Sequence, residues 1–346
     1  MQRVKYQTFS LGAHRRNWQL LQPNACQFEL TFRCDLRCTY CYTACYNQPG
    51  HFTKELSASQ VCYILDKVYQ AGVIWLTLTG GDPLTRKDFL EIYAYAKKKG
   101  FLISIFTNGC SMNKETVLYL KKNLPFAIEV TLNAVTEDTY EKISGKSHSF
   151  KKAMEAIALM RTHSLPLKIK TQVTRENVYQ LPQIKKFVRA IGLKFHPDAI
   201  LFPRLNKDKV PCTLRLEPEQ IMRLNGKPFT KEGGCSVPLR NRDNRRLFFP
   251  CTITGGDGFW INPYGEMFLC NLMRKPCFNL LRHDLLPAMQ QLLSAVRNRT
   301  MSKNASCSNY CRWRGTCLNC PGKAYLEKGD EEARLEYYCS LAGRKV

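Results

Sequence analysis

The stretch FELTFRCDLRCTYC, residues 28–41, places three cysteines on one short segment directly after an apolar run. These cysteines, Cys34, Cys38 and Cys41, follow the spacing C-x3-C-x2-C. Thiols this close together are reactive unless something binds or joins them. The spacing therefore indicates a bound partner for all three thiols at the end of a predicted strand.

Composition limits what that partner is. The chain has 346 residues, 44% of them hydrophobic, which is enough for about two domains with sizeable cores. It contains no 18-residue apolar run, and its first ten residues, MQRVKYQTFS, lack the apolar segment of a signal peptide. We therefore expect a cytoplasmic protein without a membrane span, in which 17 cysteines indicate metal binding rather than disulfides.

The chain is strongly basic, because lysine and arginine exceed aspartate and glutamate by 24. Such an excess is typical of proteins that bind nucleic acid, an acidic peptide or an anionic cofactor. Solvated surface charge is the alternative explanation. The net charge alone does not choose among them.

Six short β-rich runs alternate with segments of helical periodicity between residues 25 and 202. One such helix carries a capping box, with Ser57 as N-cap and Gln60 three residues later. This alternation predicts an α/β fold with a parallel sheet, either an open partial barrel or a doubly wound sheet. The six runs are FELTF (28–32), VIWLTLTG (73–80), FLISIFTNG (101–109), FAIEVTLN (126–133), LKIKTQV (167–173) and LKFHPDAI (193–200).

The notable motifs follow consecutive predicted strands. The cysteines come after the first strand, GGDP (80–83) after the second, and TNG (107–109) at the end of the third. In barrels the chemistry lies at the carboxyl ends of the strands. We therefore expect these motifs to meet at one site.

The remaining segments suggest a four-part organisation. Residues 1–24 form an N-terminal extension and 25–202 the barrel. Residues 203–250 form a proline-rich connecting segment with the basic run RNRDNRR (240–246). Residues 251–346 are rich in cysteine and are predicted to be poor in long helices.

The cysteine spacing and GGDP together indicate a specific cofactor. Three thiolates can hold three irons of a 4Fe–4S cluster and leave the fourth iron open. Tyr40 places an aromatic ring beside that cluster, and Asp82 can receive an ammonium group. This set resembles the radical S-adenosylmethionine (radical SAM) superfamily, in which cysteines spaced C-x3-C-x-aromatic-C hold the cluster. There, S-adenosylmethionine chelates the open iron through its amino and carboxylate groups.

The resemblance implies further cofactor contacts. The segment 80–83 matches the family stretch GGEP, with aspartate in place of glutamate. Thr131 and Asn133 lie where relatives contact the ribose, although ordinary strand-end capping explains them equally well. Ser144 stands where relatives often place an arginine for the cofactor carboxylate. The implied cofactor-binding residues are Tyr40, Gly80, Gly81, Asp82, Pro83, Thr107, Asn108, Thr131 and Asn133.

Seven C-terminal cysteines resemble the SPASM extension of radical SAM enzymes that modify peptides and proteins. The pattern C-x9–15-G-x4-C is present at 251–270, whereas the later quartet has its outer spacings exchanged. The resemblance implies a partial (β/α)6 TIM-like barrel followed by a small SPASM domain with two auxiliary 4Fe–4S clusters. One cluster takes Cys307, Cys311, Cys317 and Cys339, and the other takes Cys251, Cys270 and Cys320, with Cys235 as the candidate fourth ligand.

The resemblance also implies a reaction. An external donor such as ferredoxin or flavodoxin reduces the N-terminal cluster, S-adenosylmethionine is cleaved to a 5′-deoxyadenosyl radical, and the radical removes hydrogen from the substrate. The SPASM layout favours a ribosomally made peptide, modified by crosslinking, epimerisation or oxidation. Only 33 residues precede Cys34, too few for a leader-binding domain, so we expect leader recognition to use a separate protein or another surface.

Two alternatives stay open. Tetrapyrrole-modifying radical SAM enzymes of cofactor biosynthesis share the SPASM layout. A zinc-ribbon protein that binds nucleic acid fits the net charge of +24 and the aromatic and basic segment NYCRWRGTC (309–317). That last alternative leaves GGDP and the ordered strand ends unexplained, so we do not expect nucleic acid as a partner.

The cysteine pattern predicts the iron content. Three 4Fe–4S clusters require about twelve irons per chain. Iron analysis of anaerobically reconstituted protein should approach this value and fall on replacing Cys307 or Cys339. A content near four that is insensitive to those replacements would show that the C-terminal cysteines hold no iron.

Overall fold

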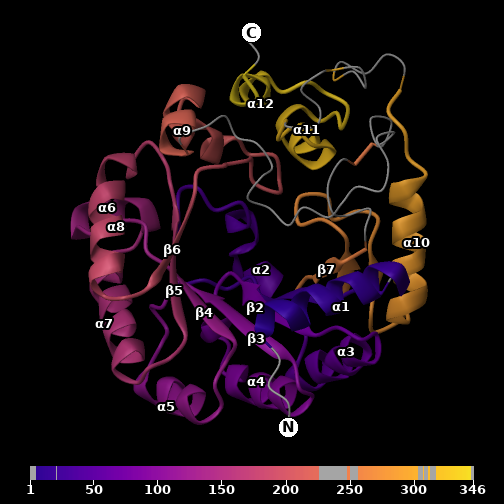
Figure 1. Ribbon diagram of the computed structural model, residues 1–346, viewed down its shortest axis with the longest axis horizontal. Coiled ribbons are helices and arrows are strands. Elements are labelled where there is room, and N and C mark those ends of the chain that lie inside the picture. The colour runs from indigo at the N-terminus through magenta and orange to yellow at the C-terminus, as the bar shows by residue number, and fades with distance from the viewer. Residues whose placement is uncertain are drawn as a thin grey trace.

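The computed structural model describes residues 5–20, 22–225, 248–249, 256–302, 307, 311 and 317–343 (Figure 1). Six parallel strands form its centre: β1 (Ala25–Thr31), β2 (Trp75–Gly80), β3 (Leu102–Thr107), β4 (Ala127–Thr131), β5 (Leu167–Gln172) and β6 (Lys194–Asp198). The helices between them are α2 (Pro49–Phe52), α3 (Ala58–Gln70), α4 (Phe89–Lys98), α5 (Lys114–Lys122), α6 (Glu137–Ser144), α7 (Ser149–Thr162) and α8 (Leu181–Ala190). All six predicted strands are present.

The order of the strands decides between the two predicted architectures. They lie in the sheet in sequence order, from β1 to β6. A doubly wound sheet reverses its strand order at one point, which places helices on both faces. Here the order never reverses, and Figure 1 shows the connecting helices along the outer rim of the curved sheet. The fold is therefore the predicted partial, unclosed barrel.

The predicted capping box at the start of α3 is confirmed. The Gln60 backbone N–H donates to the Ser57 hydroxyl at 3.3 Å, and the Ser57 N–H donates to the Gln60 side chain at 3.0 Å. The buried side chains of this helix recur at helical spacing, at Val61, Ile64, Leu65 and Val68. Capping and periodicity thus agree on where the helix begins and which face packs on the sheet.

The strands are apolar on the face toward the helices and polar on the face toward the barrel interior. In β4, Ile128 and Val130 are fully buried, whereas Glu129 and Thr131 alternate with them and line a cavity. Strand β5 repeats this pattern with Ile169 and Lys170. Because side chains alternate across a strand, the helices cover one face and the other stays free for a ligand.

The N-terminal helix α1 (Tyr6–Leu20) packs at the amino ends of the strands. Its His14 ring stacks on Trp75 at the start of β2, with ring centroids 4.9 Å apart. Its Tyr6 ring lies 5.0 Å from Phe126, just before β4. The helix therefore lies at the end of the barrel opposite the predicted site.

No helix in the described part of the chain is both long and apolar enough to cross a membrane.

The C-terminal region extends the same sheet. Strand β7 (Gly258–Ile261) pairs in parallel with β1, and β8 (Glu266–Phe268) and β9 (Phe278–Asn279) follow in antiparallel order. Residues from the predicted SPASM segment therefore contribute a strand beside the first strand of the barrel. The proposed boundaries at residues 202 and 250 remain predictions.

The expectation that the C-terminal region is poor in long helices is wrong for one segment. Helix α10 (Leu285–Arg297) has 13 residues, and its buried side chains are Leu285, Ala288, Met289, Leu292, Leu293 and Val296. This spacing is that of an amphipathic helix, so the segment 285–297 carries a helical signal independent of the cysteines. The region also contains α11 (Pro321–Lys328) and α12 (Glu336–Leu341).

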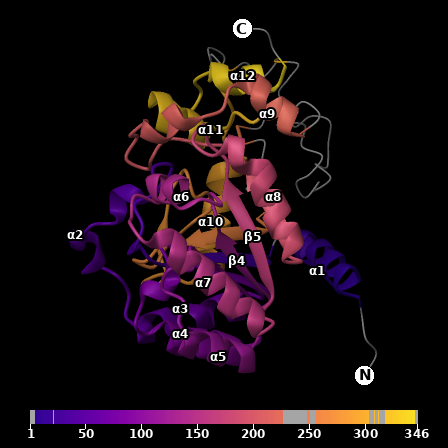
Figure 2. The ribbon, with the colours of Figure 1, turned by 90° about the vertical axis from the view of Figure 1, so that its left-hand side faces the viewer.

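Helices α11 and α12, together with α9 (Pro218–Asn225), lie beyond the carboxyl ends of the strands (Figure 2). A second buried cluster joins them to the barrel, with Val173 from the end of β5 and Leu341 from α12 among its members. The Tyr338 hydroxyl donates to the Leu201 carbonyl at 3.0 Å. The C-terminal helices are therefore packed onto the side of the barrel that carries the predicted site.

A buried ion pair ties the C-terminal region to β1. The guanidinium of Arg274 donates to both carboxylate oxygens of Glu29 at 2.7 Å. The two side chains are only 13% and 3% exposed, respectively. Parallel bonds of this kind are among the strongest polar contacts in proteins.

Replacing Arg274 with Ala should lower the free energy of unfolding by about 3–5 kcal/mol, because Glu29 would be left charged and unpaired in the interior. Anaerobic denaturant titration measures the change. Arg282, an exposed arginine of the same region, provides the matched control as Arg282→Ala. Equal stability of the two variants would contradict a structural role for the pair.

Candidate active site

A cavity of about 480 Å3 lies at the carboxyl ends of the parallel strands. Every strand from β1 to β6 contributes to its wall, and so does β7 through Trp260. Ten of the predicted site residues line it: Cys34, Cys38, Tyr40, Cys41, Gly80, Gly81, Thr107, Asn108, Thr131 and Asn133. The fold therefore brings together residues that are up to 99 positions apart in the sequence.

The cysteine loop, residues 34–41, is held from several sides. The Asn47 side chain donates to the Cys34 carbonyl at 3.0 Å, and the Arg37 N–H donates to the Ser144 carbonyl at 2.8 Å. At the other end of the loop, the Asn133 amide donates to the Tyr40 hydroxyl at 2.7 Å. These bonds present all three thiols to the cavity.

The thiols are held where burial opposes their ionisation. Burial and, to a smaller extent, the neighbouring Cys41 raise the pKa of Cys38 to about 12. The pKa of Cys34 is also raised, first by burial and then by Asp82. A cationic group bound by the thiolates would offset this cost.

The donor set fits a 4Fe–4S cluster. It consists of three soft sulfur donors on one loop, and polar groups point at the sulfurs. The Leu36 N–H and the Asn108 amide approach the Cys34 sulfur at 3.4 and 3.5 Å. Hydrogen bonds to the sulfurs are one means by which proteins tune such clusters. Within the described residues, no group of three or more His, Cys, Asp or Glu side chains is arranged so that it could hold a single metal ion.

Gly80 and Gly81 allow the ends of β1 and β2 to touch. A Cβ atom at position 80 would lie 2.2 Å from the Thr31 carbonyl oxygen, and one at position 81 would lie 2.2 Å from that of Arg33. Gly80 also has a φ of 134°, which other residues rarely adopt. Glycine is therefore required at both positions.

Asp82 lies behind the cavity wall rather than on it. Its carboxylate is fully buried and accepts hydrogen bonds from the Thr107 hydroxyl and the Asn108 N–H, both at 2.7 Å. Burial raises its pKa to about 7, against the effect of these bonds. Pro83 is also buried outside the cavity. Asp82 thus holds the end of β3 in place, and a direct contact with an ammonium group stays a prediction.

Ser144 does not replace the arginine of the family pattern. Its side chain is buried and shares a hydrogen bond of 2.7 Å with the Ser149 hydroxyl. Its hydroxyl therefore stabilises the C-terminal end of α6. Its carbonyl accepts the hydrogen bond from the Arg37 N–H of the cysteine loop. Ser144 does not line the cavity.

The cavity also contains charged residues that the sequence motifs did not single out. They are the inward-facing members of the strands: Glu29, Glu129, Lys170, His196 and Asp198. The sequence indicates two of them, Glu129 in FAIEVTLN and Lys170 in LKIKTQV, because charged and apolar residues alternate in these runs. Alternation alone, however, does not tell the barrel interior from solvent.

Four of the C-terminal cysteines lie close to one another. Burial raises the pKa of Cys317, and the neighbouring thiols of Cys339, Cys307 and Cys311 raise it further. The Asn319 side chain approaches the Cys307 sulfur at 3.5 Å, and its N–H approaches the Cys317 sulfur at 3.4 Å. These four are the residues that the resemblance assigns to one auxiliary cluster, and their role as ligands stays a prediction.

Only part of the second proposed set of cluster ligands lies within the described residues. The Cys270 sulfur lies 3.7 Å from the position of a Cβ on Gly322, two residues after Cys320. Cys251 and Cys235 lie outside the described residues, as does the basic run 240–246. The structure therefore places Cys270 beside the Cys320 segment and leaves the rest of this set as a prediction.

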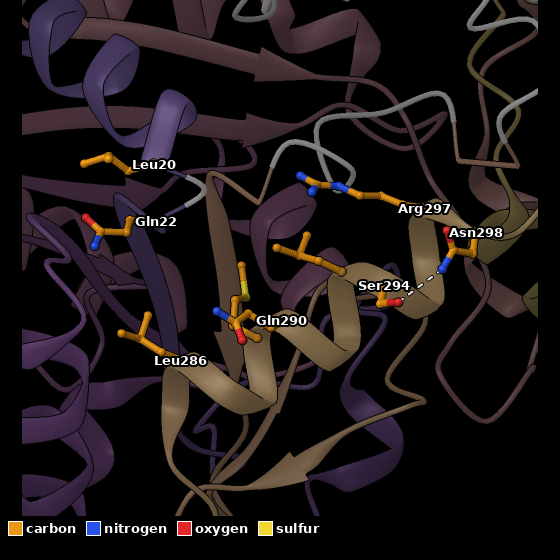
Figure 3. Close-up of a pocket in the computed structure, with 9 residues that line it drawn as sticks. Leu20, Gln22, Leu286, Gln290, Ser294, Arg297 and Asn298 are labelled. Atoms are coloured by element: carbon orange, nitrogen blue, oxygen red, sulfur yellow. Dashed lines mark hydrogen bonds between the residues drawn. The ribbon is translucent and has the colours of Figure 1, made fainter.

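A second cavity, of about 530 Å3, lies between the end of α1 and helix α10 (Figure 3). Its lining includes Leu20, Leu286 and Arg297, and the Asn298 amide donates to the Ser294 hydroxyl there at 3.1 Å. None of the predicted site residues lines it. The chemistry indicated by the sequence is therefore located in the barrel cavity.

Comparison with known proteins agrees with this site. The sequence profile described as the Radical SAM superfamily matches residues 28–175. An AdoMet-dependent heme synthase of Methanosarcina barkeri is 21% identical over 347 residues, which covers 93% of this chain and 98% of the relative. The protein of the same name from Nitratidesulfovibrio vulgaris is 24% identical over 349 residues, which covers 92% of each.

The fold also matches a solved structure. The crystal structure of Streptococcus suis SuiB bound to the precursor peptide SuiA has a TM-score of 0.70 and 16% identity, covering 98% of this chain and 82% of that chain. The matched profile begins in β1 and contains the cysteine loop, the two glycines and Asn133. The cysteine spacing of the region that follows the barrel resembles the SPASM layout, with the outer spacings of its quartet exchanged. The segment 28–175, which contains the cysteine loop and most of the barrel, therefore matches the radical SAM superfamily.

Proposed function

We propose that this protein uses S-adenosylmethionine to remove a hydrogen atom from a carbon of a ribosomally made peptide. The observation that carries the proposal is the convergence of Cys34, Cys38 and Cys41 with Gly80 and Gly81 on one cavity. When bound, the 4Fe–4S cluster and S-adenosylmethionine supply the 5′-deoxyadenosyl radical chemistry. The chain's own residues bind, orient and shield these groups.

Different parts of the cavity wall would bind, orient and shield the cluster and the cofactor. The cysteine loop would hold the cluster, and the backbone of Gly80 and Gly81 would border the bound cofactor. Thr131 and Asn133 face the same space from β4 and its following loop. Phe202 and Trp260 add apolar surface, which excludes water from a reactive intermediate.

The proximity of four cysteines supports an auxiliary cluster as part of this proposal. These are Cys307, Cys311, Cys317 and Cys339. We infer a second auxiliary cluster at Cys270, Cys320 and Cys251, with Cys235 as its fourth ligand. Such clusters provide a place for an electron that leaves the substrate, or a ligand for the substrate itself. An external electron donor such as ferredoxin or flavodoxin would supply the electron for a cluster held by Cys34, Cys38 and Cys41.

The structural neighbour supports a peptide substrate, and the size of the cavity is compatible with one. Sites for drug-sized ligands have volumes of about 300–1,000 Å3. A cavity of about 480 Å3 that also holds S-adenosylmethionine has room for one side chain rather than for a large substrate. The reacting group must therefore be presented by a molecule that remains partly outside, as a peptide would do. SuiB, with the same fold, binds its precursor peptide SuiA.

A tetrapyrrole is the second candidate substrate. The two relatives called AdoMet-dependent heme synthases align with at least 92% of this chain. A tetrapyrrole can also present one peripheral substituent to the cavity while its ring stays at the entrance. The cavity volume is therefore compatible with this candidate as well.

The first test concerns the cysteine loop. Replacing Cys34, Cys38 and Cys41 together with Ala should abolish the formation of 5′-deoxyadenosine, because these thiols hold the cluster that reduces the cofactor. Iron bound by the C-terminal cysteines should remain. The matched control replaces Cys62 and Cys212, which lie outside the cavity, and should retain activity. Continued cofactor cleavage by the triple variant would place the radical chemistry elsewhere.

The second test identifies the substrate class. Reduced enzyme and S-adenosylmethionine are incubated either with small peptides encoded beside the gene or with a propionate-bearing tetrapyrrole. The true substrate should stimulate 5′-deoxyadenosine formation and change in mass. Deuterium placed on its reacting carbon should appear in the 5′-deoxyadenosine. Transfer from the tetrapyrrole alone would replace the peptide proposal with the second candidate.

A further inference from the structure

Lys170 is a cavity residue that the cluster and cofactor sites leave without a role. It lies in β5, level with Thr131 of β4 and His196 of β6. Its side chain reaches the interior of the barrel, where its ammonium group lies 3.5 Å from the centre of the Phe106 ring. The lysine therefore places a positive charge in the same cavity as the cysteine loop.

Among the described residues, no carboxylate forms a hydrogen bond with this ammonium group. Glu129 forms a long ion pair with it, at 4.0 Å, which is beyond hydrogen-bond distance. Glu129 is also shared with Lys168, whose ammonium lies 3.4 Å away. Asp198 accepts the Ile200 N–H at 2.9 Å and also interacts with Lys323. Each acidic neighbour thus has another cationic or N–H partner.

The pKa of Lys170 also indicates that its charge is only partly balanced by the neighbouring carboxylates. Burial lowers its pKa to about 8, although Glu129 and Asp198 act in the opposite direction. A dedicated ion pair would have kept the pKa near or above the ordinary lysine value. The site would therefore gain from an additional anion close to the ammonium.

We propose that Lys170 binds a carboxylate of the substrate inside the barrel and so selects substrates that carry one. The three N–H donors of an ammonium suit a carboxylate, and a charge-assisted hydrogen bond is stronger than one between neutral groups. This inference deepens the function proposed above and rests on it. Lys170 thus acts as a specificity residue, because it binds the carboxylate of the substrate.

The carboxylate has two possible sources. In a peptide it belongs to an aspartate or glutamate side chain, and in a tetrapyrrole it belongs to a propionate. Both are short alkyl carboxylates that can enter the cavity while the rest of the molecule stays outside. The experiment therefore includes an arm for each source.

The first experiment compares Lys170→Met, which removes the charge at similar length, with Lys170→Arg, which keeps it. For an acidic substrate, Lys170→Met should raise KM roughly 10- to 100-fold, as expected for loss of a hydrogen bond to a charged group. Lys170→Arg should recover part of this loss. The affinity for S-adenosylmethionine and the substrate-free formation of 5′-deoxyadenosine should stay unchanged in both variants.

The matched control is Lys168→Met, which removes a lysine beside the same Glu129 but outside the cavity lining. It should leave KM unchanged. Substrates with the carboxylate blocked, as glutamine in the peptide arm or as the methyl ester in the tetrapyrrole arm, should bind equally weakly to wild type and Lys170→Met. A persistent preference for the free acid in Lys170→Met would overturn the proposal.

The second experiment needs no known substrate. Reductive methylation of the reconstituted holoenzyme, followed by mass spectrometry, measures the accessibility of Lys170 in the presence of S-adenosylmethionine. Glutarate should reduce labelling of Lys170, whereas glutaramide, which lacks the charge, should not. Equal labelling with both compounds would refute a carboxylate site.

The same experiment distinguishes a failure of the Lys170 carboxylate site from a failure of the proposed radical chemistry. Complete protection of Lys170 by S-adenosylmethionine alone would show that the lysine contacts the cofactor and not the substrate. That result would leave the proposed radical chemistry intact. Loss of the radical chemistry itself would instead appear as an absence of 5′-deoxyadenosine from wild-type enzyme.

Discussion

The contact between the ends of β1 and β2 is the constraint on which the rest of the site depends. The Gly81 N–H donates to the Thr31 carbonyl at 2.7 Å, and the Asp82 N–H donates to the Arg33 carbonyl at 2.8 Å. Only glycines at 80 and 81 leave room for those carbonyls. The contact fixes where the cysteine loop begins, and it brings Asp82 to the position from which its carboxylate holds the end of β3. A single backbone approach thus aligns three consecutive strand ends.

The polar inner face of the barrel follows from the same arrangement of strands. Helices cover only the outer face, so the inward-facing residues need not form an apolar core. Glu129, Lys170 and Asp198 are tolerated there because they line a cavity and the opposite charges interact. Some of the stability available from a filled apolar interior is thereby given up in favour of a binding site.

The C-terminal region contributes to the site as well as following it. Strand β7 adds Trp260 to the cavity wall, and Arg274 neutralises Glu29 at the base of the same wall. Removing this region would leave a buried carboxylate unpaired and one edge of β1 open, two costly conditions. The barrel and the cysteine-rich region therefore form one active-site structure, even though their sequence patterns differ.

The sequence by itself determined the six strands, the capping of α3, the cysteine loop and the glycines that border the cavity. Those features depend on local chemistry: apolar periodicity, capping residues, ligand spacing and the absence of a Cβ atom. The choice between a partial barrel and a doubly wound sheet required the strand order, because both arise from the same alternation of strands and helices. The position of Asp82 behind the wall, the return of β7 to β1 and the charge of Lys170 inside the barrel depend on contacts between distant residues. Only the tertiary structure decided them, because alternation along a strand does not say which face meets solvent, helix or ligand.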